Sequence, residues 1–419
     1  MKKIFLLLLS CILLIGCGRG RGVDGGHNGG TTERLLYSFS QGSAGFYYNP
    51  PTLVGNYIYI GTSRGFLYDV ASDNYFFKLN LNLTKVWEYP LGNKEVRGGA
   101  TLDGSGNIYF VIEEGRLKGD NSNSKLYLYS LDNNGVFRWS KIITSSVSSM
   151  GMPNPAIAAD NTIYIGGDKF YALDTSGNEK WNYGNNMTIM NAPIIDPNGN
   201  IYFSANGSVI SLDQNGTERW TFATSGEFFS SPAFSVDYSK IFVAVENKVY
   251  SLETSTGNKV WEFTPTGMVG WFRATPAVDD NNNVYIGTKA DNNSVFYAIK
   301  ADGSGILWKN EIGADLYSSP ALGNDNTVYV GSEFSGGSGI RFHALDMTTG
   351  NTKWSASLSA DPTWSSPAIS DKGTLYIASM DYLGTGGGVY AFRTDSTGLL
   401  PNAGSPRFHG GNSNTGRRE

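Results

Sequence analysis

The sequence predicts an all-β protein, an eight-bladed β-propeller built from four-stranded antiparallel blades. Seven tryptophans recur at spacings of 39 to 52 residues, which indicates a repeat array rather than one irregular domain. Each tryptophan follows an apolar, alternating segment and a turn rich in Asp, Asn and Gly. A second strand pair, with strands of the form NVYIGT, lies upstream of each copy. No segment shows convincing helical periodicity, so the chain is expected to be all-β.

The clearest copy of the repeated phrase is FHALDMTTGNTKW, residues 342–354, and FYALDTSGNEKW at 170–181 is a close variant. A strand, a tight polar turn and a second strand are typical of a β-hairpin. We expect the tryptophan to lie on the outermost strand and to cover the hairpin of the neighbouring blade, with small residues allowing close approach. These structural docking residues are Trp87, Trp139, Trp181, Trp220, Trp261, Trp308 and Trp354.

The upstream hairpin begins at a Pro-Ala or similar pair. The sequence SSPA occurs at 230–233, 318–321 and 365–368, and a strand such as 283–288 follows a short turn. Eight strands of this kind and eight of the FYALD kind can be counted. Four strands in each of eight units describe a β-propeller.

The last unit, residues 365–393, lacks an outermost strand, whereas residues 34–40 (RLLYSFS) form a strand-like segment outside the repeat count. This segment stands as far before Pro51 as Trp261 stands before Pro276. We therefore predict that the N-terminal strand completes the last blade and closes the ring, which removes an open edge. The propeller is assigned to residues 34–395. The C-terminal tail, 396–419, has no strand pattern and is expected to pack across one face or to fray.

Residues 1–16 are predicted to be a lipoprotein signal peptide. Lys2 and Lys3 precede an apolar run that is too short for a permanent membrane span. The sequence Leu14-Ile15-Gly16-Cys17 resembles a bacterial lipobox, which implies cleavage before Cys17 and lipid attachment to its sulfur. The alternative is an ordinary secretory peptide. Residues 17–33 form a Gly-rich tether, and Gly18, in place of Asp, favours the outer membrane.

The composition argues against nucleic acid as a partner. The net charge is −5, and no basic stripe runs along the chain. The three histidines, at 27, 343 and 409, have no triad or zinc-ligand spacing. Asp-rich turns such as 279–283 and 119–124 lack the spacing of a calcium loop, and tight hairpins require the same residue types. We therefore predict no catalytic residue, no metal site and no cofactor, and a monomeric propeller.

One set of loops is aromatic and rich in sulfur, and each of these loops stands just before an innermost strand. We expect them to surround one mouth of the channel and to form a binding face, because exposed aromatic patches mark interaction sites. The alternative is that they pack between blades. The predicted contact residues are Tyr47, Tyr48, Met152, Phe228, Phe229, Trp271, Phe272, Arg273, Tyr317 and Trp364.

Several of these features resemble known families. ALDMTTGNTKW, ending at Trp354, resembles the tryptophan-docking motif of quinoprotein-type propellers (PQQ-like repeats). The lipobox, tether, eight units and length resemble the outer-membrane barrel-assembly scaffold lipoproteins. The tail PRFHGGNSNTGR resembles a segment of quinone-binding-like repeat proteins, with Ser405 and Gly411 where Trp and Asp are usual.

The resemblance implies a lipid-anchored, non-enzymatic scaffold that binds a protein partner in the bacterial envelope, with outer-membrane barrel assembly as its most concrete form. One alternative is a quinoprotein (PQQ-dependent) dehydrogenase. That class implies a calcium site of Glu, Asn and Asp, a catalytic Asp and usually adjacent cysteines, whereas the only cysteines here are Cys11 and Cys17. The other alternative is a surface glycan- or protein-binding module.

Overall fold

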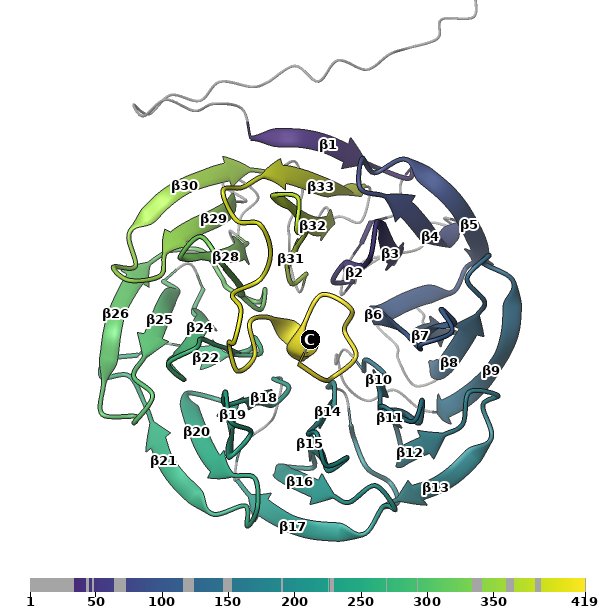
Figure 1. The fold of residues 1–419 in the computed structure, drawn as a ribbon, viewed down its shortest axis with the longest axis horizontal. Helices are drawn as coiled ribbons and strands as arrows, with labels where there is room; N and C mark the ends of the chain where they lie inside the picture. The colour runs from purple at the N-terminus through teal and green to yellow at the C-terminus, as the bar shows by residue number, and fades with distance from the viewer. Residues whose placement is uncertain are drawn as a thin grey trace, which may run out of the picture. The chain divides into compact units, whose positions relative to one another are not determined.

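The computed structural model describes residues 34–418 apart from 43–44, 47–48, 64–72, 116–123, 146–152, 190, 225, 227–229, 269, 292, 334–340, 359–364 and 381–385. The described residues form eight antiparallel sheets arranged as a ring around a central channel (Figure 1). This confirms the predicted eight-bladed β-propeller. Among these residues no helix is long and apolar enough to cross a membrane.

In blades one to four, four consecutive strands run from the channel to the rim. Blade one consists of β2 (Thr52–Val54), β3 (Tyr57–Gly61), β4 (Asn74–Asn80) and β5 (Lys85–Gly92). Blade two consists of β6 (Glu95–Leu102), β7 (Ile108–Glu114), β8 (Lys125–Leu131) and β9 (Phe137–Thr144). Blade three consists of β10 (Ala156–Ile157), β11 (Ile163–Gly166), β12 (Phe170–Leu173) and β13 (Glu179–Tyr183). Blade four consists of β14 (Ile194–Ile195), β15 (Ile201–Ala205), β16 (Ser208–Leu212) and β17 (Glu218–Ala223).

Blades five to seven repeat the pattern, with one addition in blade six. Blade five consists of β18 (Ala233–Phe234), β19 (Lys240–Val245), β20 (Lys248–Glu253) and β21 (Lys259–Phe263). Blade six consists of β23 (Ala277–Val278), β24 (Val284–Lys289), β25 (Val295–Ile299) and β26 (Ile306–Glu311), with β22 (Trp271–Phe272) as a short extra strand beside β24. Blade seven consists of β27 (Ala321–Gly323), β28 (Thr327–Ser332), β29 (Arg341–Asp346) and β30 (Thr352–Ser357).

Blade eight joins the two ends of the propeller. Its inner strands are β31 (Ala368–Ile369), β32 (Thr374–Met380) and β33 (Gly387–Arg393), and its outermost strand is β1 (Leu35–Phe39). β1 pairs antiparallel with β33, with Tyr37 opposite Ala391 and Phe39 opposite Val389. The N-terminal strand therefore closes the ring, as predicted, and the last sheet has a paired β33 instead of a bare edge.

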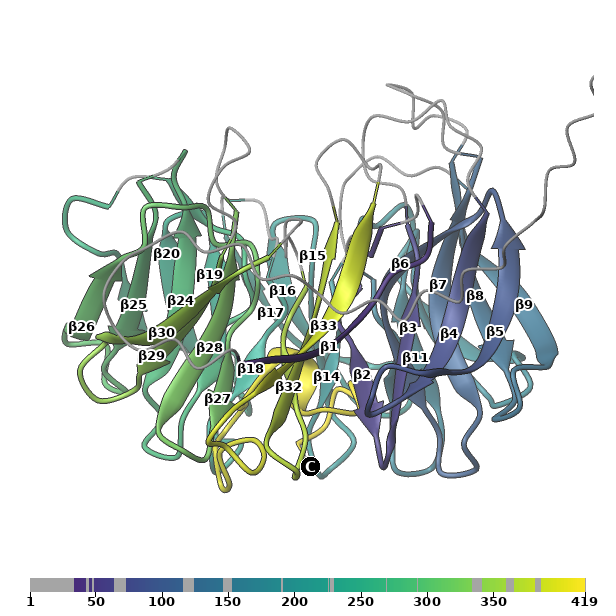
Figure 2. The same cartoon turned by 90° about the horizontal axis from the view of Figure 1, so that it is seen from above.

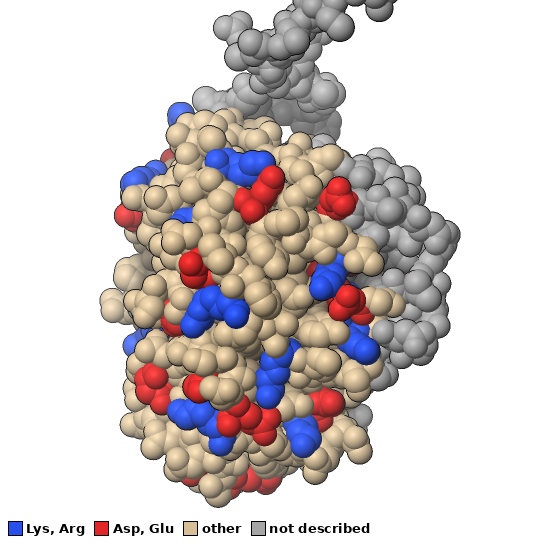
Figure 3. Space-filling view, turned by 90° about the vertical axis from the view of Figure 1, so that its right-hand side faces the viewer, with Lys and Arg blue, Asp and Glu red and all other residues tan. Residues whose placement is uncertain are grey.

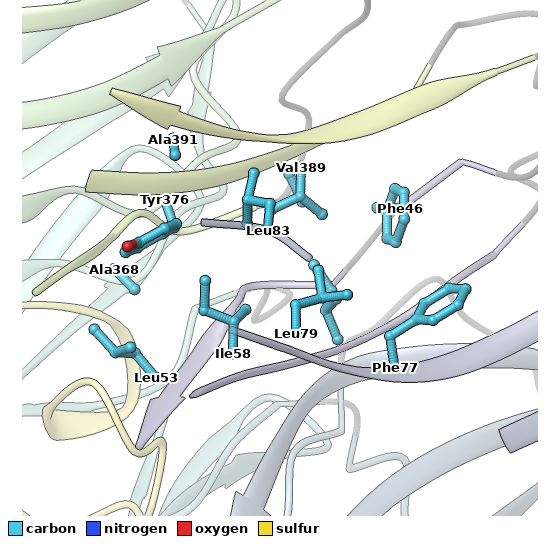
Figure 4. Packing of buried hydrophobic residues seen from close by; sticks show 12 residues of the cluster. Phe46, Leu53, Ile58, Phe77, Leu79, Leu83, Ala368, Tyr376, Val389 and Ala391 are labelled. Atoms are coloured by element: carbon cyan, nitrogen blue, oxygen red, sulfur yellow. The ribbon is translucent and has the colours of Figure 1, made fainter. Parts of the chain in front are cut away.

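Apolar side chains fill the seams between blades, because alternating residues of each strand face the neighbouring sheet. At the closing seam, Leu53, Ile58 and Leu79 of blade one lie in one cluster with Tyr376 and Val389 of blade eight (Figure 4). Equivalent clusters occupy the other seams. In Figure 3, Lys and Arg are interspersed with Asp and Glu on the visible side, without a patch of one sign.

The C-terminal tail is packed against the ring. Residues 403–411 are buried, and the tail includes one short 3₁₀ turn, η1 (Phe408–Gly410). The tail lies at the centre of the ring in Figure 1 and at one end of it in Figure 2. It therefore lies across one end of the channel and does not fray, because its polar groups bond to the innermost strands, as described below.

Candidate binding face

The Asp-rich turns are saturated by hydrogen bonds within the turn. In blade six, Asp279 Oδ1 accepts bonds from the backbone N–H groups of Asn281 and Asn283, and Oδ2 accepts bonds from Asn283 Nδ2 and the Tyr285 hydroxyl. Burial and the Asp279 charge raise the pKa of Tyr285, so its hydroxyl remains a donor. Asp103 and Asp196 have the same set of partners. These carboxylates hold turns, and their oxygens are already occupied by donors.

The acidic and histidine side chains of the described residues are dispersed over the fold. Across the described part of the chain, no group of three or more His, Cys, Asp or Glu residues could hold a metal ion. His343 and His409 lie in different parts of the fold and each has a local partner, Ser332 Oγ and the Pro193 carbonyl respectively. The Asp-rich segment 119–124 falls almost entirely outside the described residues. The described residues therefore supply no cluster of three acidic or histidine ligands for the calcium ion that the quinoprotein alternative implies.

The repeated tryptophans join neighbouring blades. Trp139 Nε1 donates a hydrogen bond of 2.9 Å to the carbonyl of Thr175 in the next blade, and the ring covers Gly177 in the same turn. A Cβ on Gly177 would lie 2.8 Å from the Trp139 ring, which is too close for any larger residue. Gly177 also has φ +84°, a backbone conformation that favours glycine. Trp87, Trp181, Trp220, Trp261 and Trp308 make the equivalent bond to the next blade.

Two further networks link the blades, and neither was predicted from the sequence. Arg138 NH1 donates to the Tyr109 hydroxyl and to Ser130 Oγ, while NH2 donates to the Thr175 carbonyl of the next blade. Arg219 of blade four repeats this arrangement with its own Tyr, Ser and Thr partners. The sequence does contain a pattern that could have revealed this network. In both blades an Arg directly precedes the docking Trp, and a Tyr follows the turn Asp by six residues.

The second network is a series of hydrogen bonds from backbone amides to Ser and Thr hydroxyl groups around the channel. The backbone N–H of Ala192 donates to Ser231 Oγ, that of Ser231 to Thr275 Oγ1, and that of Thr275 to Ser319 Oγ. Each bond therefore connects one blade to the next. These bonds explain why a Ser or Thr recurs before Pro, as in SSPA. A hydroxyl at this position accepts a hydrogen bond from a buried amide of the preceding blade.

Only four of the ten predicted contact residues lie within the described residues. Tyr47, Tyr48, Met152, Phe228, Phe229 and Trp364 lie outside them, as does the lipid-attachment candidate Cys17. Trp271 is 49% exposed. Arg273, with its guanidinium carbon 5.9 Å from the centroid of the Trp271 ring, and Tyr317 are both half-buried.

Phe272 corrects the prediction for that position. It is 1% exposed and packs among Ala244, Val249 and Tyr297 at the seam between blades five and six. Consecutive residues of a strand point to opposite faces, so Trp271 and Phe272 on β22 could not both face solvent. Phe272 therefore packs between blades, which was the alternative to a role in binding.

Charged groups surround the exposed indole. Trp271 is paired with Lys289 in the sheet, and Lys289 forms an ion pair with Asp291. Burial raises the pKa of Tyr317, and the carboxylates of Glu333, Asp315 and Asp291 add to this effect, whereas Arg273 opposes it. The Tyr317 hydroxyl is therefore uncharged at neutral pH. An exposed ring, a phenol and a guanidinium are the side chains that most often dominate interface energies.

This cluster lies at the opposite end of the channel from the tail. Trp271 pairs with Lys289, the last residue of β24, whereas the tail residue Ser405 pairs with Val278, which is opposite Val284, the first residue of β24. Six strand residues separate the two ends by roughly 16 Å. We call the Trp271 end the aromatic end and the other the tail end.

A groove of about 860 Å³ lies elsewhere, at the rim between blades five and six. Its walls include Phe263, Tyr297 and Ile306, together with Lys309 and Glu311, which pair with each other at 2.9 Å. The two charged groups of the groove that could orient a small ligand therefore satisfy one another.

The fold and the docking tryptophans define a class: an eight-bladed propeller of PQQ-like repeats. The sequence matches the family described as outer membrane protein assembly factor BamB over residues 84–262 and 245–415. The chain belongs to this family. Membership supports a scaffold or assembly role in the cell envelope in broad terms. No match was found among curated proteins.

Solved structures agree on the fold. BamB from Moraxella catarrhalis has a TM-score of 0.60 at 15% identity, covering 86% of this chain and 99% of that one. Quinohemoprotein alcohol dehydrogenase from Comamonas testosteroni has a TM-score of 0.62 at 13% identity, covering 88% and 78%. The C-terminal WD40 domain of Sif2 has a TM-score of 0.61 at 10% identity, covering 86% and 99%. At these identities the likeness concerns the fold alone.

Proposed function

We propose that the protein is an interaction scaffold of the bacterial envelope that captures a protein partner at the aromatic end of its channel. One observation carries this proposal: Trp271 is half-exposed and flanked by Arg273 and Tyr317 at the end that the tail leaves open. A half-exposed indole contributes less to stability than a buried one, because only part of its apolar surface leaves water. Rigid aromatic and Arg side chains supply interface energy at a low entropic cost.

The more specific form of this proposal is a role in outer-membrane protein assembly. It is supported by the family, whose description names that process, and by the solved BamB propeller. The lipid anchor at Cys17 belongs to the same proposal and is supported by the lipobox-like sequence before it. Mass spectrometry of the mature N-terminus tests the anchor: a free thiol or an intact segment 1–16 would contradict it.

The experiment is photo-crosslinking in cells with a crosslinker placed at residue 271. The matched control is residue 137, because Phe137 is 45% exposed on β9 at the rim. We expect a discrete adduct from position 271 that is absent from position 137, with an envelope protein of the barrel-assembly machinery as the captured partner. Equal labelling at both positions would contradict the assignment of the aromatic end.

A variant measures the energy at this end. Trp271→Ala should weaken partner capture at least about tenfold, since truncation of a central aromatic at an interface typically costs about 2 kcal/mol or more. The melting temperature should stay unchanged, because the ring is half in solvent. Phe137→Ala is the control and should leave capture intact. Tight, stoichiometric binding of calcium and quinone with dye-linked alcohol oxidation would replace the scaffold by the dehydrogenase alternative.

A further inference from the structure

We propose that the tail end of the channel is a binding site for an extended, arginine-containing polypeptide segment, and that residues 403–418 are its resident and separable ligand. This proposal concerns the opposite end of the channel from the proposed partner face and stands independently of it. Three observations carry it: a ring of equivalent backbone donors, an arginine pocket, and apolar cores that are complete without the segment.

The donors come from equivalent positions. In seven blades the innermost strand presents the N–H of the second residue after a proline, and in each blade this N–H donates to an oxygen of the tail. The donors are Leu53, Ile157, Ile195, Phe234, Val278, Leu322 and Ile369, at 2.8 to 3.2 Å. Five of the acceptors are tail carbonyls and two are the side-chain oxygens of Ser405 and Asn412.

Blade two departs from this pattern in a way that favours the same ligand. It has Ala100 where the other blades have proline, since Thr101 and Leu102 pair with β7 as Ala156 and Ile157 pair with β11. A Cβ on the preceding residue, Gly99, would lie 2.7 Å from Asn414 Nδ2. Asn414 instead donates to Thr52 Oγ1 of blade one at 2.8 Å. Blade two therefore also packs closely against the tail, although its innermost strand donates no N–H to the tail.

Arg407 fits a pocket between blade eight and blade one. It is fully buried, and each of its five N–H groups has an acceptor. Nε donates to the Pro367 carbonyl, NH2 donates to the carbonyls of Ser366 and Pro51, and NH1 donates to Gly411 O and Asn414 Oδ1 within the tail. A planar guanidinium matches five acceptors, whereas a lysine supplies only three donors, so the pocket selects arginine.

Two other tail side chains also contact backbone groups at the inner edge of the ring. Asn412 contacts the backbone of Ile369 twice, accepting from its N–H and donating to its carbonyl at 2.7 Å, as a paired strand would. His409 Nε2 contacts the Pro193 carbonyl at 2.8 Å. Because these contacts require particular side chains at particular positions, the site recognises a sequence and not merely an extended backbone.

The apolar cores do not depend on this segment. None of the eight seam clusters contains a residue of 403–418, and the tail contributes only Leu399 and Leu400 at the edges of two clusters. The closing seam is held by the blade residues in Figure 4 and by the pairing of β1 with β33. Loss of the segment would remove the buried Ala403 and Phe408 but would otherwise expose mainly polar groups that water can satisfy, so the ring should remain folded.

The experiment keeps the whole chain and cuts it after folding. A protease recognition sequence is inserted at Pro401–Asn402, an exposed turn that precedes the segment. After cleavage, a fluorescently labelled synthetic peptide of residues 403–418 is added, and its uptake is followed by anisotropy and size exclusion. We expect the cleaved protein to keep its circular dichroism spectrum and to take up one peptide per propeller as the resident segment exchanges.

Two variant peptides test the recognition. Arg407→Lys should bind at least about tenfold more weakly, the equivalent of losing one hydrogen bond to a charged group. Thr415→Ala is the matched control and should bind like the parent peptide, because Thr415 contacts the ring through its carbonyl. Unfolding on cleavage would show the segment to be part of the core, and equal binding by the Arg407→Lys peptide would remove the arginine pocket; either result overturns the proposal.

Discussion

At the scale of single residues, the docking tryptophans show how one side chain can fix the distance between two blades. Six of them donate Nε1–H to the next blade and lie over a glycine in its outer turn. Trp354 differs, because the next blade is completed by the N-terminal strand. Its ring is covered by Arg34, whose guanidinium carbon is 5.0 Å from the centroid, and it packs near Phe392.

The contact between Trp139 and Gly177 makes a prediction about stability. Gly177→Ala should lower the free energy of unfolding by about 2–3 kcal/mol, because the new Cβ clashes with the indole and an alanine is strained at φ +84°. Gly55→Ala is the control: Gly55 has φ +57° with nothing within 4 Å, so only the backbone cost of about 1 kcal/mol applies. Urea unfolding measures both, and equal losses would show that the ring contact is unimportant.

The positions of these tryptophans could be predicted from the sequence because the repeat supplies six or seven independent copies of one pattern. Whether one particular side chain is exposed to solvent could not be predicted in this way, because such a position has no repeated copies. Trp271 and Phe272 are adjacent and equally apolar, and only the two-residue strand β22 decides which one faces solvent. Arg407 was also missed, because its acceptors are carbonyls from segments about 40 and about 350 residues away, and carbonyls carry no sequence signature.

At the scale of elements, the eight hairpin pairs and the closure by β1 followed from alternation, turn residues and spacing. The tail did not, because it is held by hydrogen bonds to strand amides and has no periodicity that a pattern could reveal. β22 was not predicted as a strand either, since its pairing with β24 covers two residues and depends on where the preceding blade places the chain. Local rules therefore succeeded where a segment pairs with its sequence neighbour, and the spacing of the repeat identified the long-range pairing of β1 with β33.

Closure by β1 makes the second prediction. Deleting residues 34–40 removes the partner of β33 and the side chains that pack at the closing seam, including Phe39. The unpaired edge should cost several kcal/mol and promote association between copies. Thermal unfolding and light scattering measure the two effects. A deletion variant that melts like the parent and stays monodisperse would show that β1 is dispensable for closure.

At the scale of the whole propeller, the two ends of the channel are chemically distinct. The tail end is filled by a polar segment that satisfies backbone donors, whereas the aromatic end presents an indole, a phenol and charged groups. Because the tail occupies one end, a partner can approach the channel only from the other end. This asymmetry is why the partner is assigned to the aromatic end and why the two proposals can fail separately.

Two buried histidines predict how the whole fold responds to acid. Burial lowers the pKa of His343 to about 4, with the Arg341 charge adding to the effect. Burial also lowers the pKa of His409 to about 4, and Arg407 contributes, while the Pro193 carbonyl opposes it. In the unfolded chain both imidazoles titrate near 6.5, so below that pH the unfolded state binds protons that the folded state cannot.

The free energy of unfolding should therefore be highest above pH 6.5 and should fall as the pH decreases toward about 4, by on the order of 3 kcal/mol for each histidine. Melting temperatures between pH 7.5 and 4.5 measure this loss. His343→Gln keeps a polar group beside Ser332 without a titrating ring, so its melting temperature should fall less steeply over the same range. Parallel curves for the variant and the parent would show that carboxylates, and not this imidazole, set the acid sensitivity of the propeller.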